Sequence, residues 1–152
     1  DAAGYGITLS SNDKATGRRL ILVINGLDSE SARAQEGERL LLWGIRNFKN
    51  IPLAKPGAPI RQAKVWAGRE KTVALTVKEP LFATVPVSVK PGDIKLISTY
   101  EAPLKAPIAA GQEVGKLTIK LPSGATTETP LVAATAVGKR GFIGRIFGAM
   151  GM

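Results

Sequence analysis

The chain has 152 residues, 44% of them hydrophobic, so it is long enough for one ordinary domain or for a small domain with appendages. It contains no cysteine and no histidine, which removes disulfide frameworks, thiolate metal sites and the commonest general base. We therefore expect neither a bound metal nor a cofactor. The net charge of +9 indicates a surface that could face nucleic acid, an anionic membrane or an acidic polymer.

The first fifty residues begin with a predicted hairpin. Residues Tyr5 to Ser10 and Leu20 to Gly26 have the composition of strands, and the polar residues 11–17 between them form the turn. Lys14, Arg18 and Arg19 are expected to be solvated side chains at the tip of this hairpin.

An amphipathic helix is predicted next, over Ala32 to Phe48. Its apolar face carries Leu41, Ile45 and Phe48, at the spacing i, i+4 and i+7. Ser29 or Ser31 can cap its start, and Gly44 in its middle indicates close packing against the hairpin or against a part of the protein outside this chain. Two strands and one helix cannot enclose a core. Residues 1–50 are therefore expected to be the end of a domain whose start is absent.

Arg33 is the one charged residue of this first segment with two sharply different interpretations. It lies in the first turn of the predicted helix, where the helix dipole favours acidic side chains. It is either a solvated side chain, paired with Glu30 or Glu36, or a residue that faces the carboxylate of a ligand.

Residues 51–137 predict a small antiparallel β-sandwich. The helix ends at a short linker, which contains Pro52, Pro56, Gly57 and Pro59. Alternating apolar residues then predict strands, separated by Gly- and Pro-containing turns. The strands are expected at residues 73–77, 81–89, 94–100 and 117–121. The aromatic residues Tyr5, Trp43, Trp66 and Tyr100 are scattered over separate elements, so we expect no nucleic-acid partner.

The last segment, residues 138–152, predicts an amphipathic tail. It is either an in-plane membrane anchor, with its cations near anionic head groups, or a helix that docks on its own domain, and we favour the anchor. The residues expected to contact the membrane are Lys139, Arg140, Phe142, Ile143, Arg145, Ile146, Phe147 and Met150. No apolar run of the chain approaches the roughly eighteen residues that a spanning helix needs.

Several motifs follow one another along the chain. They are AGY at Ala3–Tyr5, a hairpin that ends at Gly26, a helix with Arg33, Glu36 and LLLWGIRNF, then API, GQEVGKL and TPL, and finally GFIGRIF in the tail. This series resembles the C-terminal part of the serine D-alanyl-D-alanine carboxypeptidases, the low-molecular-mass penicillin-binding proteins. The resemblance implies a mainly β chain with some α structure. Residues 1–50 would be the last two strands and the C-terminal helix of an α+β domain of the β-lactamase and transpeptidase type, residues 51–137 the β-sandwich, and residues 138–152 the tail.

The resemblance also implies an activity for the parent protein. Such an enzyme removes the terminal D-alanine from peptidoglycan stem peptides through an acyl-enzyme, formed on the serine of an SxxK motif, and it is acylated by β-lactams. We expect the SxxK, SxN and KTG motifs upstream of this chain, with KTG just before Asp1, so no catalytic residue is assigned and the chain alone is expected to be inactive. Arg33 corresponds to an arginine near the site that can meet the substrate's terminal carboxylate.

The resemblance further implies a location for the protein. It would be periplasmic, attached peripherally to the outer face of the bacterial inner membrane through the tail, and involved in cell-wall synthesis and cell shape. The alternative is that residues 51–137 are an independent module, which binds peptidoglycan or a protein partner at the membrane surface through its basic surface.

Overall fold

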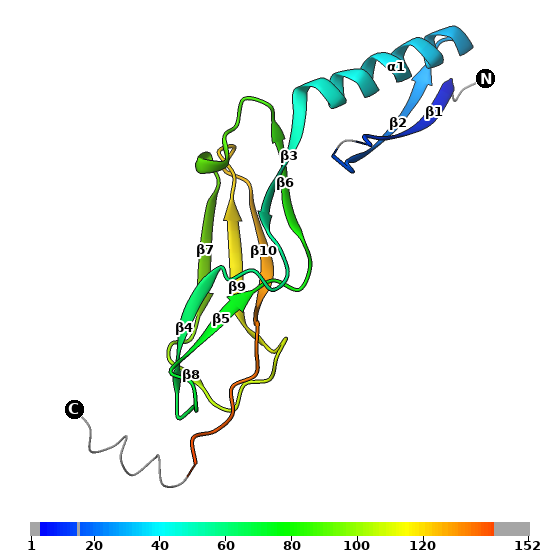
Figure 1. The fold of residues 1–152 in the computed structure, drawn as a ribbon. Helices are drawn as coiled ribbons and strands as arrows, with labels where there is room; N and C mark the ends of the chain where they lie inside the picture. Colours follow the sequence, from blue (N-terminus) through cyan, green and yellow to red (C-terminus); the bar gives the residue numbers. More distant parts are fainter. Residues whose placement is uncertain (1–3, 15, 142–152) are drawn as a thin grey trace. The chain divides into compact units, whose positions relative to one another are not determined.

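The computed structural model describes residues 4–14 and 16–141 and divides the chain into two units (Figure 1). The first consists of residues up to 51 together with residues 83–89, and the second of residues 52–82 and of those from 90 onward. Residues 83–89, which the predicted 51–137 domain includes, therefore cluster with the first unit.

Two short strands explain this division. The strand β3 (Phe48–Ala54) follows the helix without a break, and β6 (Leu81–Pro86) pairs with it in a separate two-stranded sheet. Thr84 Oγ1 donates a hydrogen bond to Asn50 Oδ1 at 2.9 Å, and the amide of Val87 donates to the carbonyl of Asn47 at 3.0 Å. These bonds hold the segment around β6 to the end of the helix.

The first two strands form the predicted antiparallel hairpin, and each is slightly longer than expected. They are β1 (Tyr5–Asn12) and β2 (Arg19–Leu27). Half-buried and exposed residues alternate along both strands, as they do in a sheet that is covered on one face. In β2 the exposed positions include Ile21 and Val23, which are 63% and 61% exposed. The uncovered face of the hairpin therefore exposes two large apolar side chains beside polar ones such as Thr8 and Ser10.

The helix α1 (Glu30–Asn47) covers the other face of the hairpin. Ser29 caps it, since its Oγ accepts a hydrogen bond from the amide of Ala32 at 3.0 Å. The predicted Ala32–Phe48 helix is thus confirmed, with a start two residues earlier. Gly44 is buried, and a Cβ at that position would lie 2.8 Å from Cδ2 of Leu20. The close packing that Gly44 indicated is therefore against the hairpin.

Arg18 is buried, so the prediction of a solvated hairpin tip is wrong for this residue. Only 8% of it is exposed. Its Nη2 donates to the carbonyl of Ile45 at 2.9 Å, and its Nη1 donates to the carbonyl of Phe48. The last carbonyls of a helix have no partner within the helix, and a cation there complements the dipole. Its neighbours Lys14 and Arg19 are exposed, as expected.

The second unit is built on one six-stranded sheet, which confirms the mainly β fold with a single long helix. The strand order is β7-β9-β10-β5-β4-β8. All neighbours are antiparallel except β4 and β8, which are parallel, so the sheet is mixed and not purely antiparallel. The strands are β4 (Arg61–Trp66), β5 (Thr72–Thr76), β7 (Lys95–Tyr100), β8 (Leu104–Lys105), β9 (Glu113–Lys120) and β10 (Thr126–Ala133), and a short 3-10 helix η1 (Pro91–Asp93) precedes β7.

A bulge in β10 lets this sheet curl around its core. Thr126 to Val132 pair with β9, with a register shift between Leu131 and Val132, and β10 begins to pair with β5 at Val132. A bulge bends and twists a strand, and Figure 1 shows β5 running obliquely to β9 and β10. Leu75, Leu117 and Leu131 are fully buried in one apolar cluster between the parts of the sheet.

No helix within the described residues is long and apolar enough to cross a membrane.

Candidate functional site

Arg33 lies in the first turn of α1 and is paired with Glu30. Its Nη2 is 2.9 Å from Oε1 of Glu30, and the two side chains are 35% and 79% exposed. The structure therefore contains the ion pair that was one interpretation of this residue. An exposed pair of this kind adds little stability, typically less than about 1 kcal/mol, so Arg33 can exchange Glu30 for another carboxylate at little cost. Its contact with a substrate stays a prediction.

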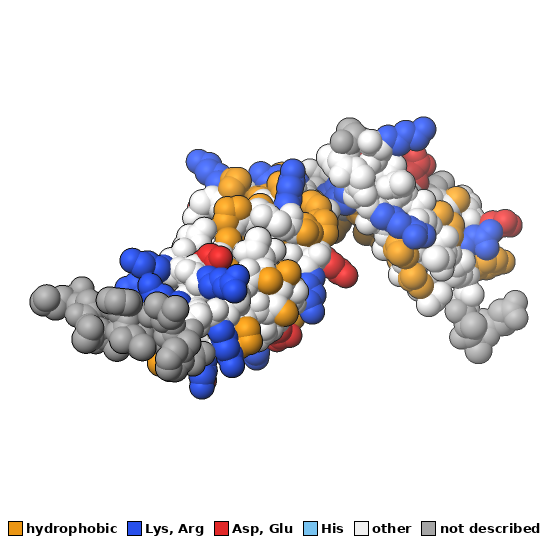
Figure 2. All heavy atoms as spheres, turned by 60° about the horizontal axis from the view of Figure 1, so that its bottom comes forward, with side chains coloured by type: hydrophobic (Ala, Val, Ile, Leu, Met, Phe, Trp, Pro, Cys, Tyr) orange, Lys and Arg blue, Asp and Glu red, His pale blue; other side chains and the backbone are white. Residues whose placement is uncertain are grey.

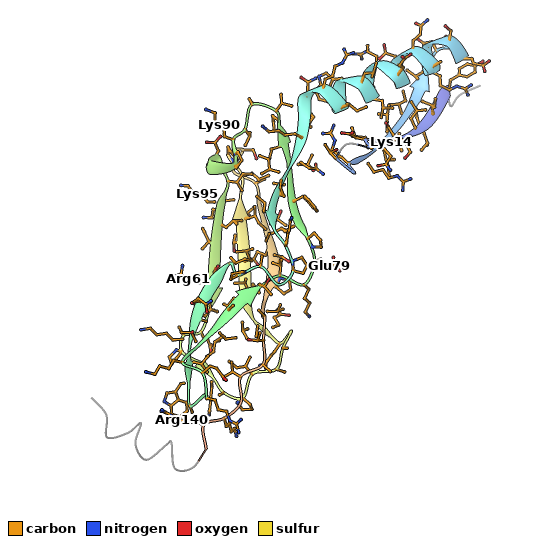
Figure 3. All side chains as sticks on the ribbon, in the orientation of Figure 1. Lys14, Arg61, Glu79, Lys90, Lys95 and Arg140 are labelled. Atoms are coloured by element: carbon orange, nitrogen blue, oxygen red, sulfur yellow. The ribbon has the colours of Figure 1, made fainter. Side chains whose placement is uncertain are left out.

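The sequence corrects one part of the expectation about catalytic motifs. Ser11 and Lys14 have the spacing of SxxK, and Ser10 and Asn12 have that of SxN, although no KTG triplet occurs. Ser11 belongs to the strand β1, and Lys14 is an exposed residue of the following turn (Figure 3). Residues three apart share a face on a helix, and a strand followed by a turn does not provide that geometry. We therefore assign no nucleophile to Ser11.

An apolar groove lies beside the helix in the first unit. It has a volume of about 390 Å³, and its apolar lining includes Leu20, Leu22, Leu40, Leu41, Trp43 and Phe48. Trp43 is 53% exposed, and its ring meets that of Phe48 edge-on, with 5.4 Å between the centroids. Ile21 of the uncovered hairpin face also lines this groove, so the exposed apolar surface of the first unit continues from one to the other.

The predicted membrane-contacting residues are only partly within the described chain. Lys139 and Arg140 are described and exposed, whereas Phe142, Ile143, Arg145, Ile146, Phe147 and Met150 lie outside the described residues. The amide of Arg140 donates to the carbonyl of Ala67 at 2.9 Å, and Lys139 forms an isolated β-bridge with Gly68. The start of the tail is thus fixed to the turn after β4.

Lys139 and Arg140 line a basic groove that the sequence analysis did not identify. The groove has a volume of about 630 Å³, and three further cations, Arg69, Lys71 and Lys105, line it together with Trp66. We call this surface the Trp66 groove. Its residues come from three separate stretches of the chain, so no local pattern reveals it. Figure 2 brings this end of the β-rich unit forward and shows several Lys and Arg side chains on it.

No group of three or more acidic side chains that could hold a metal ion occurs among residues 4–14 and 16–141.

Comparison with known proteins shows which family the chain belongs to. Residues 48–139, more than half of the chain, match the family described as "Penicillin-binding protein 5, C-terminal domain". The chain belongs to this family. The similarity also extends upstream of the domain. The D-alanyl-D-alanine carboxypeptidase DacC of Escherichia coli is 33% identical over 149 residues, and DacD of Salmonella typhimurium is 29% identical over 144. Each alignment covers 95% of this chain and 36% of the relative, so the chain spans about a third of their length.

A solved structure has the same fold. Penicillin-binding protein 5 from Haemophilus influenzae superposes with a TM-score of 0.77 at 29% sequence identity. The superposition covers 91% of this chain and 40% of that protein. The resemblance noted in the sequence is confirmed, both for the family and for the mainly β fold.

Proposed function

We propose that this member of the penicillin-binding protein 5 family is the C-terminal part of a serine-type D-alanyl-D-alanine carboxypeptidase. The parent enzyme removes the terminal D-alanine from peptidoglycan stem peptides through an acyl-enzyme, and β-lactams acylate the same serine. One observation carries the proposal: the similarity to proteins named D-alanyl-D-alanine carboxypeptidases covers 95% of the chain and is not confined to the β-domain. The nucleophile lies in a part of the parent protein upstream of this chain.

The packing of the first unit supports an upstream domain. A two-stranded sheet with a helix on one face leaves its other face open, and here that face exposes Ile21 and Val23. Large exposed apolar residues gathered on one face indicate a surface that another part of the protein covers. Further strands and helices of a penicillin-binding domain would supply that cover.

Arg33 is the residue of this chain that we propose to bind the substrate. A guanidinium binds a carboxylate through paired hydrogen bonds, and the terminal carboxylate of the stem peptide is such a group. The exposed Glu30 leaves the pairing of Arg33 replaceable. In the parent protein, Arg33→Gln is expected to raise KM for a peptide ending in D-Ala-D-Ala and to leave folding unchanged. Arg39→Gln, which removes another exposed cation of α1 that is also paired with a glutamate, is the matched control.

The β-rich unit and the tail have a second role in this proposal. The unit holds the catalytic domain away from the membrane or contacts partners, and the tail attaches the protein to the outer face of the bacterial inner membrane, in the periplasm. The three basic residues of segment 138–152 and the absence of acids from it support this role. Removal of residues 142–152 leaves the fixed residues Lys139 and Arg140 in place, and it is expected to abolish most sedimentation with anionic vesicles.

The test of the activity is the release of D-alanine from a peptide that ends in D-Ala-D-Ala. The protein with its upstream segment is expected to release D-alanine, and a β-lactam is expected to stop the release. If the extended protein folds and neither hydrolyses such a peptide nor reacts with a β-lactam, the proposed function is wrong.

A further inference from the structure

Most of the cations that line the Trp66 groove have no part in the functions described so far. Its five cations come from the turn after β4, from β8 and from the chain after β10. Within the described chain, the three ion pairs are Arg33–Glu30, Arg39–Glu36 and Lys116–Glu128, and none includes a cation of the groove. The groove lining contains no acidic residue. Glu70 lies between Arg69 and Lys71 in the chain but does not line the groove. The five like charges that line it repel one another, so a bound anion would stabilise the cluster.

The backbone under the groove is fixed by hydrogen bonds that join its three stretches of chain. The amide of Ala106 donates to the carbonyl of Trp66 at 3.1 Å, and the amide of Arg69 donates to the carbonyl of Gly138 at 2.9 Å. The bond from Arg140 to Ala67 joins the same two stretches again, the residues after β10 and the turn after β4. Ala67 itself has a φ of 58°, a conformation that residues with a side chain rarely adopt. The cations are therefore carried on a preformed support.

Trp66 adds an aromatic surface to this basic groove. It is 59% exposed, and Nζ of Lys105 lies 5.9 Å from the centroid of its ring. Exposed tryptophans are enriched where a protein meets the head-group region of a bilayer, because the indole has both an apolar body and a polar N–H. A tryptophan surrounded by lysines and arginines fits a surface that presents both anionic phosphates and apolar glycerol and acyl groups.

We propose that the Trp66 groove binds the phosphate head groups of anionic phospholipids and holds this end of the folded β-rich unit directly on the membrane surface. The proposal rests on the proposed membrane association, and it assigns part of that association to the folded domain in addition to the tail. Charge argues against the tail as the occupant. Residues 142–152 contain Arg145 and no acid, so they carry the same sign as the groove. The groove volume of about 630 Å³ accommodates a phospholipid head group.

The first test compares two triple variants of the full chain that lose the same charge. Arg69→Gln, Lys71→Gln and Lys105→Gln remove three cations of the groove. The control, Lys90→Gln, Lys95→Gln and Lys120→Gln, removes three exposed cations from elsewhere on the unit, and Figure 3 shows Lys90 and Lys95 at the end opposite Arg140. The probe is sedimentation with vesicles of phosphatidylglycerol and phosphatidylcholine.

The two variants are expected to differ strongly. A basic side chain next to an anionic surface strengthens binding by about fivefold, so the groove variant is expected to bind roughly a hundredfold more weakly than the wild type. The control is expected to stay within about threefold, because charges more than about 10 Å from the surface are screened. Equal losses in the two variants would overturn the proposal, since they would show a net-charge effect without a groove.

The second test measures, by its fluorescence, whether Trp66 enters the lipid. The chain has two tryptophans, so Trp43→Phe leaves Trp66 as the only one. Its emission is expected to shift to the blue on phosphatidylglycerol vesicles, and lipids with brominated acyl chains are expected to quench it. Unchanged emission of vesicle-bound protein would overturn the proposal. An equal shift of the emission with millimolar glycerol phosphate would also overturn it, because it would indicate a site for soluble phosphate. Retardation of an oligonucleotide that depends on the groove cations would overturn it as well.

A tail variant separates this proposal from the proposed anchoring by the tail. Phe142→Ser with Phe147→Ser leaves the groove intact. If both proposals hold, this variant keeps a weaker, salt-sensitive binding that the groove substitutions remove. If only the tail matters, the tail variant loses all binding and the groove variant loses none, and the groove proposal is then wrong while the proposed function stands.

Discussion

Replacement of Arg18 by methionine should loosen the C-terminal end of α1. Methionine keeps an unbranched apolar stem that reaches the ε position but removes the guanidinium, which donates to the carbonyls of Ile45 and Phe48. These carbonyls would lose their only side-chain donor in the described structure. Apolar packing, such as that of Leu20 against Gly44, would then remain between the hairpin and the helix.

The size of the effect follows from these contacts. A hydrogen bond to a charged group contributes about 1.5–3 kcal/mol, and a cation at a helix C-terminus up to about 2 kcal/mol. Against this stands the cost of burying the guanidinium, whose Nε has no hydrogen-bond partner in the described part of the chain. An unsatisfied buried group of this kind costs about 1–3 kcal/mol. The expected net loss is about 2–4 kcal/mol.

Amide hydrogen exchange measures this loss where it occurs. A loss of about 2–4 kcal/mol corresponds to exchange that is roughly 30-fold to 800-fold faster in the last turn of α1. The amide of Leu117 in β9 is the internal control and should not change. Arg19→Met is the matched variant, because Arg19 is the exposed neighbour whose Nε donates to Ser10 Oγ, and an exposed substitution is expected to matter by less than about 0.5 kcal/mol. Equal effects of the two variants would refute the role of Arg18.

Two further predictions concern backbone packing and pH. Gly115→Ala would place its Cβ against the carbonyl oxygen of Thr99 and 2.6 Å from Cβ of Tyr100. It should destabilise the β-rich unit by about 1–3 kcal/mol in chemical unfolding, whereas Gly92→Ala, which meets nothing within 4 Å, should be neutral; equal effects would contradict the close approach. Arg39 donates hydrogen bonds to the Glu36 carboxylate and so lowers its pKa below the ordinary 4.5. A lowered folded-state pKa stabilises α1 above pH 4.5, and this stabilisation is lost as the pH falls through the lowered value. Arg39→Gln should raise the Glu36 pKa in an NMR titration, and an unchanged pKa would show that the pair does not form in solution.

The strands that could be predicted from the sequence are those that alternate cleanly. Val73 and Leu75 of β5, and Leu117 and Ile119 of β9, occupy every second position and are buried. β7 is different, because its adjacent Leu96 and Ile97 are both exposed. β3 and β4 were missed because they flank a stretch with Pro56 and Pro59, which reads as a linker. β10 was missed because Pro130 interrupts it, and the parallel pair β4–β8 could not be predicted because β8 has only two residues.

Among the functional residues, too, those with a local sequence signal could be predicted, and those that depend on distant contacts could not. Arg33 could be singled out, because a cation in the first turn of a helix is a local irregularity. The burial of Arg18 could not be predicted, since its partners are backbone carbonyls 27 and 30 residues further along the chain. The Trp66 groove was missed for a similar reason, because the turn after β4, β8 and the residues after β10 meet only in the folded unit.

Labelling with a fluorescent penicillin shows whether the acylated serine lies outside this chain. We predict that this chain alone is not labelled, although Ser11 and Lys14 have the SxxK spacing. We also predict that the protein with its upstream segment is labelled covalently, on a serine outside these 152 residues. Covalent labelling of this chain alone, or a folded full-length protein that penicillin does not label, would contradict the claim that the chain completes a penicillin-binding carboxypeptidase.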